Sequence, residues 1–269
     1  MPIEEIIEKS FNDLIKAITT DGTSSQLIFP HSNKGDVRHS EQELKQIFLR
    51  NVEEDKNYFY SIETPTEYGY RFSDTEMPLV KENHEKDDKY ESARFDVSLY
   101  SKNNKDDLLT HVEFKYGNPD KKSGICKDFL KLVSEVDLTK EKKNIFVHYL
   151  CVKNEKGWQS QTFPSLFKKY CDSIVDIEES LKRSTNQDKT KRFLEKLSKN
   201  LMNYLQNITV YLLCFFEDSK SSSVYRFSLK NLESYINNEK ENKDLTDKSW
   251  LNEEIFNLGE EIHFKEIKK

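Results

Sequence analysis

The amino-acid sequence predicts an α/β (α+β) fold, in which helices flank a mixed central β-sheet. The first observation is that strand-like and helix-like segments alternate in the middle of the chain. The second is residues 144–152 (NIFVHYLCV), which are apolar on both faces and therefore fit the centre of a sheet. The third is a pair of segments with alternating polarity, residues 93–100 and 108–117, which is typical of a β-hairpin.

The length and composition of the chain fit a folded protein. A chain of 269 residues can bury a sizeable core, as one large domain or two small ones. Charged residues make up 33% of the sequence and aromatic residues 12%, which argues against a disordered chain. No apolar run approaches the roughly 18 residues of a membrane span, and the first helix carries acids where a secretory signal carries bases. We therefore expect a cytoplasmic protein with no membrane partner.

The four cysteines are spread along the chain without a Cys-x-x-Cys spacing: Cys126, Cys151, Cys171 and Cys214. This pattern is typical of buried free thiols in a reducing compartment. It predicts neither a zinc site nor a disulfide framework.

Charge is distributed unevenly along the chain. The net charge is −6, but residues 140–199 hold 14 Lys and Arg against 8 Asp and Glu, so the remainder is strongly acidic. A basic segment beside an acidic remainder is compatible with a phosphate-facing surface next to a metal-binding centre. The alternative is a set of solvated helix faces. The basic run at 182–200 holds a single aromatic residue, so contact there would be with nucleic-acid phosphates and not with bases.

Two helices are predicted before the hairpin. Residues 3–18 place their apolar side chains on one side of a helix. A second helix is predicted to start after Ser40, because Ser40 and Glu43 have the spacing of a capping box. Between this helix and the hairpin, residues 57–72 predict two strands with a break, and the polar residues 73–91 predict a long loop.

The later part of the chain continues the alternation of helices and strands. Helices are predicted for 124–136, 164–182 and 191–208, and strands for 209–217 and 222–229. His148 lies in the apolar run 144–152 and is expected to be a hydrogen-bonded core residue.

The tripeptide Glu113-Phe114-Lys115 is the strongest chemical signal. Glu-x-Lys recurs in this chain, but elsewhere it falls in predicted helices or polar loops, where the side chains meet water. Here it lies in a strand, whose alternation places Glu113 and Lys115 on one face with His111, roughly 7 Å apart at about 3.3 Å per residue. The carboxylate can bind Mg²⁺, and the ammonium can orient or deprotonate a water or offset charge on phosphate. A lone His on such a strand is more often packed or exposed than catalytic.

A second carboxylate is expected from Asp96. The alternation of residues 93–100 puts the apolar side chains on the opposite face: Phe95, Val97 and Leu99. The hairpin would bring Asp96 into register with Glu113. An Asp in the middle of a strand is unfavourable unless something satisfies it. Either a metal ion does so, or Asp96 pairs with Arg94 or Lys115 on a solvated face.

The order of these features resembles the PD-(D/E)XK nuclease superfamily, the fold of many restriction endonucleases and Holliday-junction resolvases. In that family a helix bearing Glu precedes a strand bearing Asp, a strand bearing (Asp/Glu)-x-Lys, a helix and a further strand. The resemblance implies a restriction-endonuclease-like sheet, with a nuclease-like core at residues 38–152. Residues 1–37 would be an N-terminal helix and loop. Residues 153–269 would complete the sheet, add helices, and bind substrate or form a dimer.

The resemblance also assigns roles to residues. It implies that Asp96 and Glu113, helped by the backbone carbonyl of Phe114, bind Mg²⁺, for which Mn²⁺ could substitute. Lys115 would assist the attacking water.

The family's helical acid has two candidates here. Glu41 resembles the archaeal resolvase pattern and lies nearer the apolar face of its helix. Glu43 is the alternative, although its capping role explains it without catalysis.

Basic residues after the motif are candidates for binding phosphate, or are simply solvated. They are Lys121, Lys122, Lys127, Lys189, Lys191 and Arg192. The function these expectations predict is a Mg²⁺-dependent nuclease, an endonuclease acting on DNA by preference, of the kind found in prokaryotic restriction and phage defence. Restriction-type members of the family often dimerise, so a homodimer is also expected. The alternatives are a catalytically inactive nuclease-like module that binds nucleic acid or protein, and an interaction protein without a site.

Overall fold

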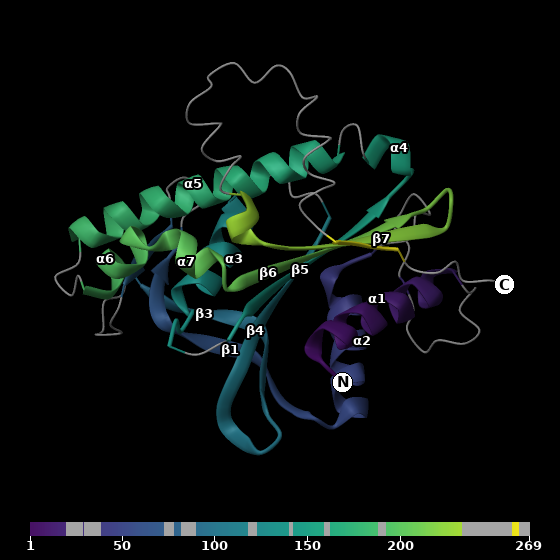
Figure 1. Ribbon diagram of the computed structural model, residues 1–269, viewed down its shortest axis with the longest axis horizontal. Coiled ribbons are helices and arrows are strands. Elements are labelled where there is room, and N and C mark those ends of the chain that lie inside the picture. The colour runs from purple at the N-terminus through teal and green to yellow at the C-terminus, as the bar shows by residue number, and fades with distance from the viewer. Residues whose placement is uncertain are drawn as a thin grey trace.

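A computed structural model gives the fold of the protein (Figure 1). The structure describes residues 1–19, 29, 39–72, 78–81, 90–117, 123–139, 142–158, 162–187, 192–232 and 260–263 of the chain.

The strands of these residues form one mixed sheet, in the order β2-β1-β3-β4-β5-β6-β7-β8. The strands are β1 (Tyr58–Arg71), β2 (Leu79–Lys81), β3 (Glu91–Ser101), β4 (Asn104–Tyr116), β5 (Asn144–Val152), β6 (Ile208–Phe216), β7 (Ser221–Ser228) and β8 (Glu260–His263). β4, β5 and β6 run parallel, and all other neighbouring pairs run antiparallel. The predicted α/β architecture with a mixed sheet is confirmed. β6 and β7, from the later part of the chain, continue the sheet beyond β5.

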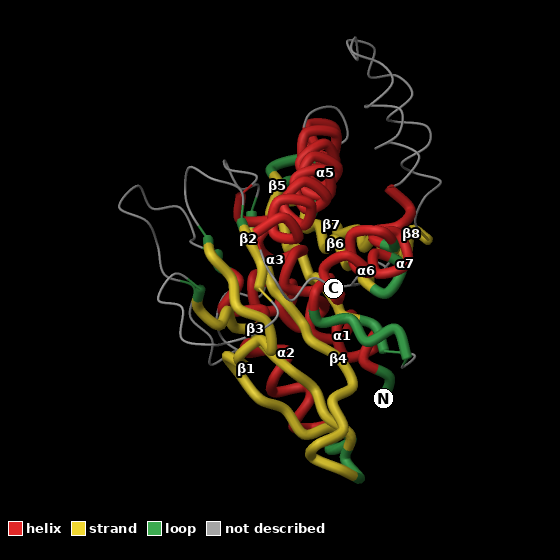
Figure 2. Tube along the Cα trace, turned by 90° about the vertical axis from the view of Figure 1, so that its left-hand side faces the viewer, coloured by secondary structure: helices red, strands yellow, loops and turns green. Residues whose placement is uncertain are grey.

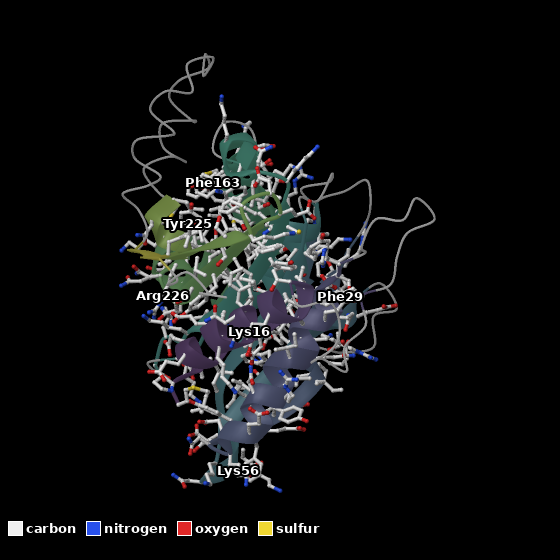
Figure 3. The ribbon with its side chains drawn as sticks, turned by 90° about the vertical axis from the view of Figure 1, so that its right-hand side faces the viewer. Lys16, Phe29, Lys56, Phe163, Tyr225 and Arg226 are labelled. Carbon is white, nitrogen blue, oxygen red and sulfur yellow. The ribbon has the colours of Figure 1, made fainter. Side chains whose placement is uncertain are left out.

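Helices cover both faces of the sheet (Figures 1 and 2). One layer contains α1 (Ile3–Thr19) and α2 (Glu41–Asp55), and the other is built around α3 (Ser123–Ser134) and the long α5 (Phe163–Gln187). The layer of α5 also contains shorter helical segments: α6 (Arg192–Lys199), α7 (Leu201–Leu205) and η2 (Leu229–Leu232). The short α4 (Glu155–Gly157) lies between β5 and α5 in the chain. In Figure 3, Lys16 lies on α1 and Lys56 marks the end of α2.

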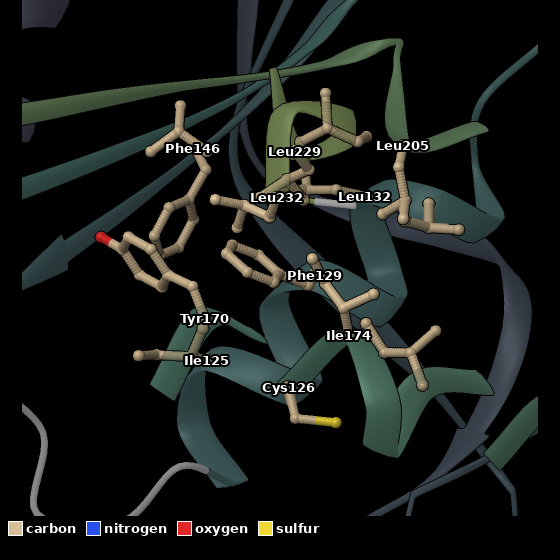
Figure 4. Packing of buried hydrophobic residues seen from close by; sticks show 14 of the residues in the cluster. Ile125, Cys126, Phe129, Leu132, Phe146, Tyr170, Ile174, Leu205, Leu229 and Leu232 are labelled. Atoms are coloured by element: carbon tan, nitrogen blue, oxygen red, sulfur yellow. The ribbon is translucent and has the colours of Figure 1, made fainter. Parts of the chain in front are cut away.

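Each helical layer packs against the sheet through its own hydrophobic core. In the core under α3 and α5, the rings of Phe129 and Phe146 meet edge to face at 4.9 Å, with Tyr170 beside them (Figure 4). The core under α1 and α2 includes Phe48. Because side chains alternate along a strand, β5 supplies Phe146 to the first core and Val147 to the second. Burial on both faces explains why this strand is apolar throughout.

The start of α2 is built from local sequence. Ser40 is the N-cap, and its side chain accepts a hydrogen bond from the backbone N–H of Gln42 at 3.3 Å. The Glu43 carboxylate accepts from the backbone N–H of Ser40 at 2.8 Å, which completes the predicted capping box. The helix ends at Lys56, whose φ of 59° is left-handed and whose N–H donates to the carbonyl of Val52.

β1 is one strand where the sequence predicted two. Its register with β3 shifts between Pro65 and Gly69. Thr66 bridges the irregular stretch, because its hydroxyl donates to the carbonyl of Tyr68 at 2.8 Å and accepts from the N–H of Ala93 at 3.0 Å. Side-chain hydrogen bonds thus replace ladder bonds at a proline that cannot donate.

The predicted loop at 73–91 contains the short strand β2. It pairs with the end of β1, and the N–H of Val80 donates to Ser184 Oγ of α5 at 3.1 Å. A contact with a helix about a hundred residues later therefore holds the strand, which local sequence cannot reveal.

The four cysteines are free thiols, as predicted. Three of them are buried, and Cys151 is half-buried at the end of β5. Within the described residues, no helix is long and apolar enough to cross a membrane.

Candidate active site

Seven charged side chains from four elements form one group, which we call the carboxylate–lysine cluster. They are Glu41 and Lys45 of α2, Asp96 of β3, Glu113 and Lys115 of β4, and Asp128 and Lys131 of α3. The cluster includes the four side chains that the sequence predicted as catalytic. Strand and helix positions far apart in the chain therefore meet at one place.

Asp96 lies where β3 leaves its ladder with β4. The pairing at this end of the ladder stops at Val97 and Val112. Asp96 Oδ2 instead accepts a hydrogen bond from the backbone N–H of Phe114 at 2.8 Å. Asp96 Oδ1 lies 3.0 Å from Lys45 Nζ. A backbone donor and an ammonium group therefore satisfy this mid-strand carboxylate, and neither predicted partner, Arg94 or Lys115, does so.

The backbone carbonyl of Phe114 faces the same opening between β3 and β4. In a strand, the N–H and the C=O of one residue point toward the same neighbour. Because the N–H of Phe114 points at Asp96, its carbonyl also lies on the Asp96 side of β4. The ring of Phe114 packs against Phe48 of α2 at 5.4 Å, which fixes this backbone.

Phe95 lies on the opposite face from that predicted. Its ring stacks on the His111 ring at 3.9 Å and belongs to the core under α3 and α5. Val97 and Leu99 belong to the core under α1 and α2. The two-residue alternation fails because β3 separates from β4 between Phe95 and Val97, at Asp96.

Glu113 is buried in the centre of the cluster. Its side chain is 5% exposed, and Oε1 lies 2.7 Å from Lys131 Nζ. Lys131 Nζ also donates to the carbonyl of Arg94 at 3.0 Å and lies 3.3 Å from Asp128. Burial, together with the nearby charges of Asp128 and Asp96, raises the pKa of Glu113 well above its ordinary value, and Lys131 opposes this rise. Burial and the neighbouring carboxylates therefore disfavour a negative charge on Glu113.

Lys115 points toward the beginning of α3. Its Nζ lies 3.2 Å from Asp128, and a Cβ added at Gly124 would lie 3.4 Å from it. Burial acts to lower the pKa of Lys115, but Asp128, Glu41 and Glu113 outweigh it and raise the pKa above the ordinary value. Lys115 is therefore an ammonium cation at neutral pH.

Glu41, the first residue of α2, lies within electrostatic range of the cluster. Burial, then the charges of Asp96 and Asp128, raise its pKa, while Lys115 and Lys45 oppose the rise. Glu43 is occupied by the capping box. Of the two candidate helical acids, Glu41 is thus the one that lies among the other predicted residues.

Three members of the cluster were not identified from the sequence. Lys45 belongs to a Glu-x-Lys tripeptide that was expected to meet water. Its side chain is instead only 11% exposed and pairs with Asp96. Lys45 follows Glu41 by four residues and so lies on the same face of the helix. This spacing identifies Lys45 as a site residue only after Glu41 has been selected as the helical acid. Asp128 and Lys131 likewise share a face at i and i+3, but the sequence does not show that this face meets Glu113.

Of the predicted phosphate-binding residues, only Lys127 has a side chain among the described residues. Lys127 is half-buried on α3, with Nζ 5.3 Å from the centre of the Phe72 ring. Lys121, Lys122, Lys189 and Lys191 lie outside the described residues, as does the side chain of Arg192. Their role in binding nucleic acid remains a prediction.

The two histidines near the site are packing residues. His111 Nδ1 lies 2.8 Å from Ser98 Oγ, and burial lowers the pKa of His111 to about 4. His148 Nε2 donates to the carbonyl of Gly117, and Nδ1 accepts from the Tyr170 hydroxyl, both at 2.6 Å. Burial lowers the pKa of His148 to about 4. His148 is thus the satisfied core histidine that the sequence predicted.

A cavity of about 590 Å³ lies beside His111, away from the catalytic candidates. Its lining includes Tyr68, Glu135 and Phe193, and it contains no member of the carboxylate–lysine cluster. The rings of Tyr68 and Phe193 stack at 4.6 Å. This cavity is therefore separate from the carboxylate–lysine cluster.

The cluster fits a hard divalent cation. Its four carboxylates outnumber its three ammonium groups, and burial, together with the repulsion between carboxylates, raises the pKa of both Glu41 and Glu113. A cation between Asp96 and Glu113 would relieve this repulsion through oxygen ligands of the kind Mg²⁺ prefers. Each of these two carboxylates has an ammonium group on one oxygen, so cation binding requires Lys45 and Lys131 to share those oxygens or release them.

The chain matches no protein-family model, no curated protein and no solved structure. The geometry of the cluster is therefore the basis for a functional assignment.

Proposed function

We propose that the protein is a Mg²⁺-dependent nuclease of the PD-(D/E)XK type, with a restriction-endonuclease-like core, which hydrolyses phosphodiester bonds, in DNA by preference. Four side chains would carry the activity: Asp96 and Glu113 as metal ligands, Lys115 as a cation at the reacting phosphate, and Glu41 as a supporting acid. Mn²⁺ would substitute for Mg²⁺.

One observation carries the proposal. The Asp96 carboxylate accepts a hydrogen bond from the backbone N–H of Phe114, which lies between Glu113 and Lys115 in the chain. Glu41 interacts electrostatically with the same cluster. On a solvated sheet face, each of these side chains would extend into water separately and would not contact the others. Their convergence in a partly buried place is what an acid–metal site requires.

Asp96 and Glu113 would hold the cation through their side-chain carboxylates, with the Phe114 carbonyl as a further ligand. When bound, Mg²⁺ would polarise the phosphate and a water molecule. The N–H of Phe114 keeps Asp96 oriented in the absence of a cation, because it fixes one carboxylate oxygen at 2.8 Å. Lys45 and Lys131 act as positioning residues that neutralise Asp96 and Glu113 until a cation does so.

Lys115 would stabilise negative charge that develops on the phosphate. Its raised pKa keeps it protonated, so it serves as an electrostatic group and a hydrogen-bond donor to the attacking water. Proton removal falls to another group, and Glu41 is suited to it, because its raised pKa makes it a stronger base than an ordinary carboxylate.

The test is an incubation of purified protein with supercoiled plasmid, linear duplex, single-stranded DNA and RNA, each with Mg²⁺, Mn²⁺ or EDTA. We expect cleavage of DNA only with a divalent cation. Asp96→Asn and Lys115→Ala should each lower the rate by about 100-fold or more. The control is Lys9→Ala, which removes a lysine of α1 that contacts Asn51 and Glu54. Cleavage that survives both cluster variants would overturn the assignment.

The second candidate is a nuclease-like module that binds nucleic acid or protein without cleaving. The observation that favours it is that Lys45 and Lys131 already neutralise Asp96 and Glu113 at 3.0 and 2.7 Å. In this case no substrate is cut, and labelled DNA binds equally well with Mg²⁺ and with EDTA. Binding that depends on Mg²⁺ and is lost in Asp96→Asn supports the nuclease instead.

A cytoplasmic location is proposed from the four cysteines, whose spacing is typical of free thiols in a reducing compartment. Two further parts of the proposal rest on the resemblance alone, namely a homodimer and a role in restriction or phage defence. Light scattering with and without duplex DNA tests the first, and plaque formation on cells expressing the wild-type or Asp96→Asn protein tests the second.

A further inference from the structure

A second group of side chains that could hold a metal ion lies near the start of α2. His39 immediately precedes the N-cap of α2, Cys151 is near the end of β5, and Glu217 follows β6. One donor atom from each residue lies within 4.8 Å of the other two. None of the three belongs to the carboxylate–lysine cluster, and the sequence spacing alone does not reveal them as a set.

The group has an unsatisfied member. The thiol of Cys151 donates to Glu217 Oε1 at 3.3 Å, so these two donors are already in contact. His39 Nδ1 is buried and has no hydrogen-bond partner. The His39 ring is held beside the rings of Tyr116 and Tyr149, with centroids 6.3 and 6.4 Å away. A buried nitrogen without a partner beside a thiol and a carboxylate is an arrangement that a cation would complete.

We propose that His39, Cys151 and Glu217 form a binding site for a divalent transition-metal ion of the Zn²⁺ class, with one coordination position left to water. Imidazole, thiolate and carboxylate together suit Zn²⁺, whereas Mg²⁺ takes oxygen ligands almost alone. Bonds of about 2.0–2.3 Å put tetrahedral donors roughly 3.3–3.8 Å apart. Cys151 and Glu217 already satisfy this spacing, and a small movement of the His39 ring would bring in the third donor.

Metal binding here would be coupled to loss of the thiol proton. The thiol lies in a half-buried place beside the Glu217 carboxylate, which keeps it protonated in the metal-free protein. A bound cation replaces this proton between the sulfur and the carboxylate, and the proton passes to solvent. Affinity should therefore rise with pH.

The ion would join the start of α2 to the ends of β5 and β6. Glu41 follows His39 by two residues, and Lys45 lies one turn further along α2. A bond at His39 would thus restrict the position of the helix that carries two members of the carboxylate–lysine cluster. The metal-binding proposal itself does not depend on whether that cluster cleaves nucleic acid.

The experiment is a Co²⁺ titration of full-length protein that has been treated with EDTA, dialysed and kept reduced. We expect one Co²⁺ per chain with a near-ultraviolet thiolate-to-Co²⁺ absorption band, displaced by an equivalent of Zn²⁺. Cys151→Ser should abolish the band. His39→Gln and Glu217→Gln should each weaken Co²⁺ binding by 10-fold or more.

Two controls separate this site from other causes. Cys126→Ala removes a buried thiol in the other core and should leave the band unchanged, and Asp96→Asn should also leave it unchanged. Glu217 is exposed, so its variant is expected to fold, and Zn²⁺ should raise the melting temperature of the wild type but not of Glu217→Gln. No thiolate band, or a band that persists in Cys151→Ser, overturns the proposal whether or not the protein cleaves DNA.

Discussion

The carboxylate of Asp96 takes the place of a neighbouring strand for the backbone N–H of Phe114, at 2.8 Å. The ladder between β3 and β4 stops at Val97, the residue that follows Asp96 in the chain, so the Asp96 side chain fills the gap that the strands leave. The hydrogen bond that replaces a ladder bond at this point therefore also holds a carboxylate where β3 and β4 separate. One hydrogen bond thus links the end of the β3–β4 ladder to the candidate site.

Substitutions of Asp96 should separate its two roles. Asp96→Asn keeps an oxygen that can accept from the N–H of Phe114 but loses the charge that pairs with Lys45. Asp96→Ala loses both, and should be less stable than Asp96→Asn by about 1 kcal/mol or more, because a backbone donor is left unpaired. Urea unfolding of both variants measures this difference. Equal stabilities would mean that water satisfies the N–H of Phe114 as well as Asp96 does.

The Glu113–Lys131 pair should behave as one unit. Lys131→Met leaves a carboxylate that is 5% exposed without its cation, and we expect a loss of about 3 kcal/mol at pH 7. Glu113→Gln leaves a buried ammonium that keeps Asp128 as a partner, so its cost should be smaller. The double variant should be more stable than the sum of the two losses predicts.

Urea unfolding of the four proteins completes this comparison. The loss in Lys131→Met should shrink as the pH falls, since protonation removes the uncompensated charge of Glu113. Additive losses at pH 7 would show that the two side chains do not interact.

Local and periodic signals were enough to predict much of this site. The capping box of Ser40 and Glu43 depends on residues three apart, and the shared face of Glu113 and Lys115 depends on the two-residue period of a strand. Both are short-range rules, and the structure obeys them. The prediction failed at Phe95, because the separation of β3 from β4 at Asp96 is not encoded in polarity.

The cations of the site were missed for a different reason. Lys45 and Lys131 look like ordinary helix-surface lysines, and only tertiary packing brings them to Asp96 and Glu113. In a chain with 42 Lys and Arg, composition cannot single them out. The same holds for His39, which lies near Cys151 and Glu217 only because β5 and β6 end beside the start of α2.

Glu135 should make the protein less stable as the pH rises toward neutrality. Its carboxylate accepts from the N–H groups of Glu67 and Tyr68 at 2.9 and 3.1 Å, and burial raises the pKa of Glu135 to about 7. The unfolded chain releases this proton at about pH 4.5. The folded state therefore binds more protons between these values, and the stability that protonation provides is lost as pH rises through about 7.

Glu135→Gln keeps an acceptor for both N–H groups and removes the titration. Relative to this variant, the wild type should lose about 3 kcal/mol between pH 4.5 and pH 7, at about 1.36 kcal/mol per pH unit. Urea unfolding across this range measures the change, with the exposed Glu91→Gln as the control. A difference that stays constant with pH would show that Glu135 is ionised in the folded protein.

Lys115 should act as a cation and not as a base. Asp128, Glu41 and Glu113 raise the pKa of Lys115 despite its burial, so a neutral amine is rare at pH 7. If the side chain supplies positive charge, Lys115→Arg should retain part of the nuclease activity, while Lys115→Gln should lose about 100-fold. If a neutral amine removed the proton, both substitutions would be equally inactive, since guanidinium cannot be deprotonated.

The pH dependence of cleavage distinguishes the same two roles. If Lys115 acts as a cation, the rate rises with pH as a carboxylate base loses its proton. This rising limb of the pH profile should disappear in Glu41→Gln, because Glu41 has a raised pKa and lies near the cluster, so it can accept the proton. An amine base would instead give a rate that still rises at alkaline pH in the wild type and in Glu41→Gln. Rates measured from pH 5 to pH 10 with saturating Mg²⁺ decide between them, and a limb that persists in Glu41→Gln removes Glu41 from the mechanism.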